Sequence, residues 1–185
     1  MKSMSIKMVL LAAALLASGC SSLGTREPEA GATGNVWSKS MEAKRVALES
    51  STRDTGIAVL RTKDNQLQVN VPSDFSFDTD RADIKPNMRP VLDQFAEDLK
   101  SEALSHLLIH IIGYTDSKGS DAVNDALSLA RAVSVRKHLE SKGIASSRIE
   151  VEGRGEREPM AGNEQRYGRA LNRRVEILLR EPGKS

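Results

Sequence analysis

The residues whose types and spacing point to chemistry are Asp116, at the end of a predicted strand, and Arg131, within a predicted helix. A largely apolar run, His106–Ile112, predicts a buried strand that ends at Gly113, and the next helix is predicted over Asp121–Lys142. A carboxylate pairs with an ammonium group, and a guanidinium fork pairs with a carboxylate. If both side chains face one shallow cleft, the pair suits a zwitterion such as an amino acid.

The predicted helix has two distinct faces. Asn124, Leu127 and Arg131 recur at helical spacing on one of them. The second stripe predicts the side that packs on the core, and it consists of Ser128, Ala132, Val135 and Leu139. Gly143 follows as the residue expected just beyond the C-terminus of the helix.

These residues belong to an ordered set of three motifs. The first, G-x-T-D-x-x-G followed by N-x-x-L-S-x-x-R-A, runs from Gly113 to Ala132, and the other two are Gly153–Pro159 and Gly168–Ile177. In order and spacing they resemble the OmpA-like C-terminal domain family, which binds peptidoglycan. The resemblance covers roughly Val71 to Arg180, most of the chain that remains after a leader is removed.

The resemblance implies a role for each residue of the first motif. Asp116 would pair the side-chain ammonium of diaminopimelate in the peptidoglycan stem peptide, and Arg131 would pair its carboxylate. Thr115 would belong to the same binding site. Asn124 would hydrogen-bond the ligand or brace the loop. Arg173, the first arginine of N-R-R, would flank the ligand carboxylate.

Asp83 is a further candidate, on the loop before the first long helix of the domain, where it would contact the ligand by its backbone or its side chain. Its alternative reading is a charge that favours the N-terminus of that helix. Asp116 could likewise cap the following loop, and Arg131 could be a solvated helix arginine. Arg174 is expected to point away from the ligand.

The N-terminal residues predict the cellular location of the protein. Lys2 and Lys7 precede the short apolar run Met8–Ala17, which is too short to span a membrane and has the proportions of a signal sequence. Cys20, the only cysteine, ends the segment L-A-S-G-C, which resembles a lipoprotein signal cleaved before a lipidated cysteine. A lone cysteine has no partner for an intrachain disulfide. By the same resemblance, Ser21 favours sorting to the outer membrane.

Charge and residue clusters exclude several function classes. The chain has 27 basic and 25 acidic residues, and cleavage before Cys20 removes Lys2 and Lys7, so the mature chain is formally neutral and nucleic acid is not an expected partner. His106 and His110 are well separated on a strand and do not form a metal-binding pair. The sequence has no evident nucleophile–base pair. We therefore expect no cofactor, no metal and no enzymatic activity.

The domain organisation follows from these patterns. Residues 1–19 are the leader, residues 20–55 are a lipidated tether with a short helix over Ser40–Ser51, and residues 56–182 are the globular domain, with its core at 71–180. The remaining predicted elements are a hairpin of Gly56–Arg61 and Gln66–Val71, a helix over Pro86–Ser101, and the strands Arg148–Gly153 and Arg173–Arg180. Between these two strands, Glu156–Arg169 is a loop-rich stretch with room for one helical turn.

The expected fold is α/β of the α+β kind. It is a two-layer β-α-β-α-β-β sandwich in which helices cover one face of a mixed sheet, preceded by the short hairpin. The expected function is an outer-membrane lipoprotein that faces the periplasm and binds peptidoglycan non-covalently. The alternative is an envelope assembly lipoprotein that uses the same fold to bind envelope proteins.

Overall fold

The computed structural model describes residues 37, 39–53, 55–102 and 104–182. The predicted leader, Cys20 and most of the predicted tether lie outside the described residues.

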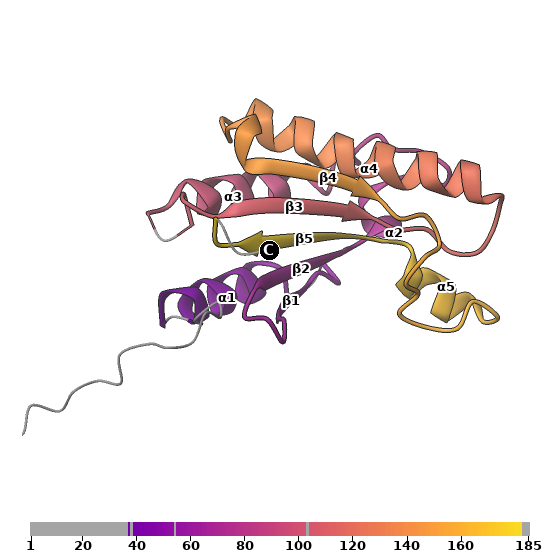
Figure 1. Cartoon of the computed structure of the whole chain (residues 1–185), viewed down its shortest axis with the longest axis horizontal. Helices are drawn as coiled ribbons and strands as arrows, with labels where there is room; N and C mark the ends of the chain where they lie inside the picture. Colours follow the sequence, from indigo (N-terminus) through magenta and orange to yellow (C-terminus); the bar gives the residue numbers. More distant parts are fainter. Residues whose placement is uncertain (1–36, 38, 54, 103, 183–185) are drawn as a thin grey trace, which may run out of the picture. The chain divides into compact units, whose positions relative to one another are not determined.

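The described part of the chain is built on a mixed sheet (Figure 1). Its strands are β1 (Ala58–Arg61), β2 (Leu67–Pro72), β3 (Leu108–Gly113), β4 (Ile149–Gly153) and β5 (Arg174–Arg180). Their order in the sheet is β1-β2-β5-β3-β4, so the last strand of the chain lies at the centre. Only β3 and β4 pair in parallel, and the other neighbours pair antiparallel.

One face of this sheet is apolar because side chains alternate along each strand. Val69 of β2 lies opposite Ile177 of β5, and Ile177 in turn lies opposite Ile111 of β3. All three are buried in a single aliphatic core. The predicted inward alternation of β2, β4 and β5 is confirmed by this register.

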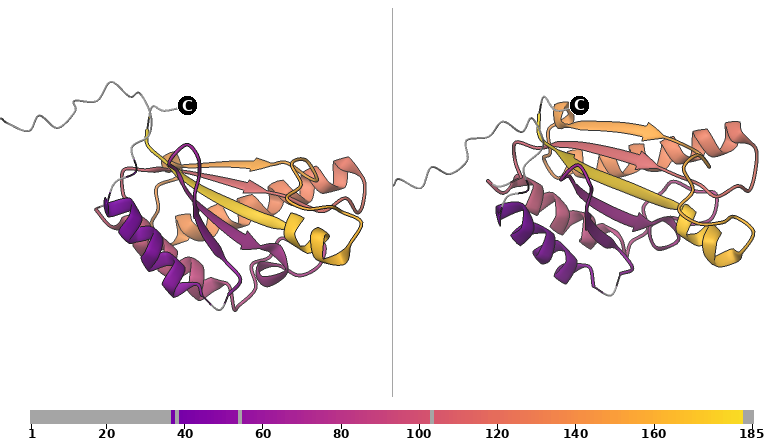
Figure 2. Two further views of the ribbon diagram at one scale, coloured as in Figure 1. Left: turned by 90° about the horizontal axis from the view of Figure 1, so that it is seen from below. Right: turned by 60° about the horizontal axis from the view of Figure 1, so that its bottom comes forward.

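Three long helices cover that face: α1 (Lys39–Ser51), α3 (Arg89–Lys100) and α4 (Asp121–Ser141). Figure 2 shows them together on one side of the sheet. Leu48 of α1, Leu92 of α3 and Leu139 of α4 all belong to the core. The predicted two-layer fold class is therefore confirmed. None of the described helices combines the length and the apolarity needed to cross a membrane.

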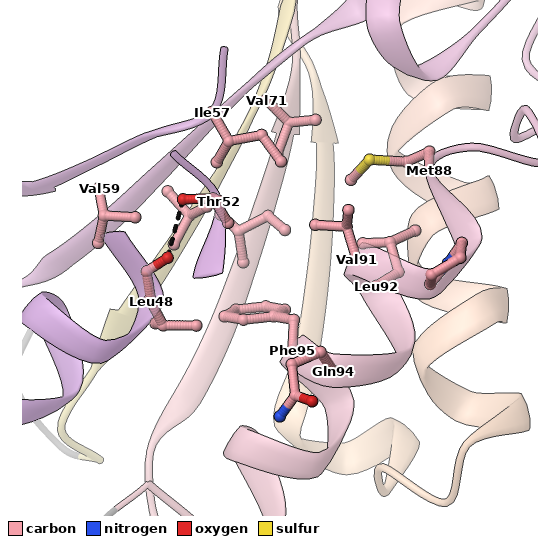
Figure 3. A pocket seen from close by; sticks show the side chains of 13 residues that line it. Leu48, Thr52, Ile57, Val59, Val71, Met88, Val91, Leu92, Gln94 and Phe95 are labelled. Carbon is pink, nitrogen blue, oxygen red and sulfur yellow. Dashed lines mark hydrogen bonds between the residues drawn. The ribbon is translucent and has the colours of Figure 1, made fainter. Parts of the chain in front are cut away.

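A hollow of about 220 Å³ remains between α1, α3 and the sheet (Figure 3). Its lining is aliphatic and aromatic, with Thr52 and Gln94 as the polar members. Thr52 follows directly after α1, and its hydroxyl donates to the carbonyl oxygen of Leu48 in that helix at 2.8 Å. The helix predicted before the domain is thus packed on the core through Leu48 and Thr52.

Some element boundaries differ from the prediction. Helix α3 begins at Arg89 rather than Pro86, because the amide of Met88 bonds the carbonyl of Lys85 in a preceding turn. The short helix α2 (Ser73–Ser76) was not anticipated.

A further helix, α5 (Arg166–Asn172), extends over the end of the stretch predicted to be loop-rich. Its sequence has no apolar stripe that faces the core, and tertiary contacts hold it in place. The Asn172 side chain accepts bonds from the amides of Met160 and Ala161 and donates to the carbonyl of Ala161 at 2.8 Å. Because these partners lie outside α5, the sequence of α5 alone gave little indication of a helix.

Candidate functional site

The predicted binding loop is placed by a close contact between α4 and the sheet. Gly113 of β3 and Gly153 of β4 are register partners at the carboxyl ends of their strands. A Cβ atom on Gly113 would lie 2.0 Å from the carbonyl oxygen of Ser128, and one on Gly153 would lie 2.5 Å from the amide nitrogen of Leu129. Only glycine permits this approach, which brings the loop after β3 beside the first half of α4.

The loop itself is held by backbone hydrogen bonds. The amide of Tyr114 donates to the carbonyl of Arg174 at 2.9 Å, and the amide of Thr115 donates to that of Gly155 at 2.8 Å. The carboxylate of Asp116 accepts the amide of Lys118 at 2.9 Å, which closes a tight turn. Asp116 is buried, and its position is therefore fixed by the fold.

Asn124 braces this loop from α4. Its side-chain amide nitrogen donates to the carbonyl oxygen of Asp116 at 3.3 Å and to the carboxylate of Glu156 at 2.9 Å. The side chain is 3% exposed, so these bonds form away from bulk solvent. Of the two roles predicted for Asn124, the structure contains the bracing one.

Arg173 clamps two carboxylates at the junction of α5 and β5. Its Nη1 donates to Oδ2 of Asp116 at 2.6 Å, while Nε and Nη2 grip Asp74 of α2 at 2.8 and 2.6 Å. The two carboxylates, Asp74 first, raise the pKa of Arg173 above its ordinary value. In return, the hydrogen bonds from Arg173 lower the pKa of Asp74.

Arg174 points elsewhere, as predicted. Its guanidinium stacks on the ring of Tyr114, 3.7 Å from the ring centroid, and Nε donates to Glu176 at 2.7 Å. Tyr114 is itself buried, and this burial, more than the nearby Glu176, raises its pKa to about 12. This cluster therefore stabilises the sheet, and Arg174 does not line the cleft, whereas Arg173 does.

Arg131 is a buried cation with an unused donor. It is 3% exposed, and its Nε donates to the carbonyl oxygen of Arg81 at 3.0 Å. The guanidinium also lies over the ring of Phe77, 5.3 Å from the centroid. Nη1 is buried and has no hydrogen-bond partner among the described residues. Burial lowers the pKa of Arg131, because removal from water disfavours the charged form.

These side chains line one cleft of about 700 Å³. Among the predicted ligand contacts, it contains Thr115, Asp116, Asn124, Arg131 and Arg173. The hydroxyl oxygen of Thr115 is a second buried polar atom without a partner among the described residues. Two buried, unsatisfied donors on residues that line one cleft are unusual, because burying an unpaired polar group is costly. They make this cleft the candidate site for a polar ligand.

Asp83 is not brought to the cleft, contrary to the predicted grouping. It lines a separate hollow of about 480 Å³ with residues of α3 and α4, among them Asp93 and His138. The chain after Phe77 loops out and returns to pair Phe77 with Ile84. That geometry places Asp78 and Asp80, instead of Asp83, on the cleft side of the loop.

Several further residues line the cleft and were not singled out as site residues from the sequence, among them Asp74, Phe77 and Arg166. Asp74 comes from α2, which local patterns did not indicate, and Arg166 comes from α5, at the end of a stretch for which the sequence indicated at most one helical turn. Phe77 is one of the few aromatic residues, and its place beside Arg131 depends on the loop that follows it. No local signal could have identified Asp74, whose partner is distant in the sequence.

The cleft is rich in both signs of charge. Its acidic members are Asp74, Asp78, Asp80 and Asp116, and its basic members are Lys118, Arg131, Arg166 and Arg173. Within the residues that the structure describes, no group of three or more histidine, cysteine, aspartate or glutamate side chains is arranged to hold a metal ion. The arrangement is suited to bind a ligand that carries an ammonium and a carboxylate close together.

Known proteins share this architecture. The sequence model of the OmpA family matches residues 76–173, a segment that contains the cleft loop, α4 and Arg173. The chain is 38% identical over 139 residues to the probable lipoprotein YiaD of Escherichia coli (strain K12). That match covers 75% of this chain and 62% of the relative, so the chain spans less than two thirds of the length of that relative.

Two solved structures are similar as well. The cell wall anchor of the T6SS from Pseudomonas aeruginosa superposes with a TM-score of 0.63 and 28% identity, over 75% of this chain and 96% of that one. The peptidoglycan-associated lipoprotein from Burkholderia pseudomallei superposes with a TM-score of 0.53 and 30% identity, over 57% of this chain and 87% of that one.

Proposed function

The chain belongs to the OmpA family, and from this premise we propose that it is an outer-membrane lipoprotein that binds peptidoglycan non-covalently through the diaminopimelate of the stem peptide. The domain faces the periplasm and links the outer membrane to the cell wall. It acts by binding and catalyses no reaction.

The observation that carries the proposal is the buried, unpartnered Nη1 of Arg131 in a cleft that also holds Asp116. A buried guanidinium with a free donor favours a carboxylate ligand, because each charge-assisted hydrogen bond contributes roughly 1.5–3 kcal/mol net. The side-chain end of diaminopimelate carries an ammonium and a carboxylate on one carbon. Such a group offers Arg131 its missing acceptor and offers Asp116 a cation.

Asp116 retains room for that cation. One of its carboxylate oxygens accepts from the amide of Lys118, and the other accepts from Arg173. An ionised carboxylate has about four lone-pair sites, so two remain for an ammonium. Thr115 supplies a further unpaired hydroxyl within the same cleft. Arg173 holds Asp116 in place, and its positive charge adds to the attraction for the ligand carboxylate.

The comparisons support the wall as the partner. One structural neighbour is a cell wall anchor, and another is a peptidoglycan-associated lipoprotein. Membrane attachment rests on the N-terminal sequence, where a short apolar run precedes Cys20, and on similarity to a probable lipoprotein. Two or three acyl chains on Cys20 would anchor the protein firmly, whereas a single chain binds a bilayer only marginally.

The test is sedimentation with purified sacculi, with and without excess diaminopimelate, for the wild type and for Asp116→Ala and Arg131→Ala. Each substitution should weaken binding about tenfold or more, because the ligand's opposing charge is left without its partner. Arg131→Lys should restore little, since an ammonium cannot reproduce the bidentate fork. The matched control is Arg136→Ala, on the same helix, where the arginine pairs with Glu140 and does not line the cleft.

Circular dichroism of each variant separates loss of ligand from loss of fold. Wild-type sedimentation by both cleft variants would place the wall-binding surface elsewhere on the domain. A wild-type protein that does not sediment with sacculi would favour the alternative role, in which the fold is a scaffold for envelope proteins.

A further inference from the structure

Helix α5 carries an exposed aromatic side chain, unlike the other helices and strands that the structure describes. Tyr167 is 75% exposed, and the other aromatic side chains of the described residues are buried or half-buried. Leu171, one helical turn later, is 39% exposed, and Met160 in the preceding loop is 55% exposed. We call Tyr167 and Leu171, which share one side of α5, the α5 platform.

The α5 platform does not hold the helix in place. The helix is anchored by the buried residues Gly168 and Asn172, and by Arg169, whose Nη1 donates to the carbonyls of Asn163 and Glu164 at 2.7 and 2.8 Å. Exposed apolar surface beside a binding site commonly marks a contact with a ligand or partner. The ring of Tyr167 is therefore available for a role outside the fold.

The α5 platform adjoins the cleft. Arg166, the residue before Tyr167, lines the cleft, and so does Arg173, just beyond the end of the helix. The side chain of Asn163, at the start of this segment, accepts the amide of Ser117 in the cleft loop at 3.3 Å. Figure 1 places α5 at the same end of the sheet as the start of α4. The segment that carries Tyr167 therefore borders the cleft through Arg166 and Arg173.

We infer that the α5 platform binds the glycan strand of peptidoglycan, with a sugar ring stacked on Tyr167. The inference rests on the proposed function, since the stem peptide in the cleft is covalently attached to that strand. Sugar rings present faces of C–H groups to which a flat, rigid aromatic side chain is complementary, and tyrosine offers such a surface at little cost in conformational entropy.

The other residues that line the cleft also support a glycan contact at Tyr167. Among the described residues that line the cleft, the exposed large apolar one is Val123 at the start of α4, and it has no ring. Hydroxyl groups at the edges of a sugar need donors and acceptors, and the charged side chain of Arg166 supplies donors beside the ring. Aromatic stacking next to a polar cleft thus matches a ligand with an ionised peptide and a neutral sugar.

A second contact on a linked ligand raises affinity by effective concentration, because the sugar is already held near the α5 platform once the peptide is bound. The wild-type protein should accordingly bind a disaccharide-linked stem peptide more tightly than the same peptide without sugars. The difference should depend on Tyr167 and not on Asp116 or Arg131.

The experiment is calorimetry with two probes, a disaccharide stem peptide that contains diaminopimelate and the same peptide released from its sugars by an amidase. Tyr167→Ala should weaken binding of the disaccharide probe about tenfold, as loss of an aromatic stacking partner does elsewhere, and leave the sugar-free probe unchanged. Tyr167→Phe should keep most of the affinity, because the ring is retained. Leu60→Ala, on edge strand β1 and away from the cleft lining, is the control for loss of an exposed apolar side chain.

The outcomes separate the two proposals. A wild-type protein that binds both probes equally, or a Tyr167→Ala variant with equal losses on both, overturns the glycan contact and leaves the peptide site intact. Binding of neither probe by the wild-type protein overturns the proposed function itself. A loss in Tyr167→Ala that is confined to the disaccharide probe, together with near wild-type affinity in Tyr167→Phe, establishes the α5 platform as the glycan contact.

Discussion

At the scale of single residues, Arg131 and Arg173, two of the arginines that line the cleft, have different tasks. Arg173 is already engaged by Asp74 and Asp116, so it ties α2 to the cleft loop. The guanidinium of Arg131 lies over the ring of Phe77, its Nε donates to the backbone carbonyl of Arg81, and its Nη1 has no partner among the described residues. A ligand carboxylate would therefore gain most from Arg131, although both side chains carry the same charge.

The Asp74–Arg173 pair predicts a pH dependence of stability. Arg173 lowers the pKa of Asp74 in the folded protein below its ordinary value of 3.8. A depressed carboxyl pKa stabilises the fold above the unfolded value, and this contribution is lost as the pH falls through the folded pKa. The stability difference between the wild type and Asp74→Asn should be fully present above about pH 4 to 5 and disappear at lower pH.

Urea unfolding at a series of pH values measures this difference. Asp64→Asn, at an exposed position in the β1–β2 turn, is the matched control for the loss of one carboxylate. An Asp74→Asn variant that differs from the wild type equally at pH 7 and at pH 2 would mean that the charge of Asp74, in its pair with Arg173, contributes nothing to the free energy of unfolding.

At the scale of elements, the glycine pair at the strand ends sets the position of α4. The backbone of the helix lies directly against Gly113 and Gly153, and the loop between β3 and α4 then has to place Asp116 at the mouth of the cleft. The same contact explains why Ser128 belongs to the buried stripe, since its hydroxyl accepts the amide of Gly155 at 2.9 Å. A small residue at each contact is thus a requirement of the site as well as of the fold.

Gly113→Ala should destabilise the domain by roughly 1–3 kcal/mol or more, because a Cβ atom 2.0 Å from the Ser128 carbonyl oxygen forces the helix away from the sheet. It should also weaken sacculus binding, since α4 carries Asn124 and Arg131. Urea unfolding and sedimentation measure the two effects. Gly162→Ala is the control, because its added methyl would meet the flexible end of the Glu164 side chain. Equal stability of the two variants would show that α4 can shift at no cost.

At the scale of the whole molecule, the proposal has two separate attachments. In the proposed function the protein would bind the wall through the cleft and the membrane through lipid on Cys20, which lies outside the described residues. The stretch from Cys20 to the start of α1 is rich in glycine, serine and alanine, a composition that suits a tether between them.

Cys20→Ser should release the protein into the soluble periplasmic fraction while it still sediments with sacculi, because the acyl chains supply the membrane affinity. Arg131→Ala should behave in the opposite way, staying with the membrane while losing the wall. Fractionation and mass spectrometry of the N-terminal peptide check both. A Cys20→Ser protein that remains in the membrane, together with a wild-type N-terminus that carries no lipid mass, would contradict the anchor.

Much of the fold could be predicted from the sequence, because local periodicity reports which face of an element is buried. The predicted helix Asp121–Lys142 matches α4, and Gly143 has the positive φ of +92° expected just beyond its end. The alternation of Val175, Ile177 and Leu179 correctly indicated β5 and its buried face. The spacing of Asp116, Asn124 and Arg131 also placed them in one cleft, since that spacing depends on a single strand–loop–helix unit.

Only the tertiary structure decided which distant segments complete that unit. The central position of β5, the clamp of Asp74 on Arg173, and the placement of Asp80 instead of Asp83 at the cleft all depend on chain segments that are far apart in the sequence. The same holds for α5, whose anchors lie outside the helix, and for the burial of Arg131 beneath the loop after Phe77. Periodicity records burial within an element, whereas pairing between elements depends on which edges and side chains meet when the chain closes on itself, and no local pattern contains that information.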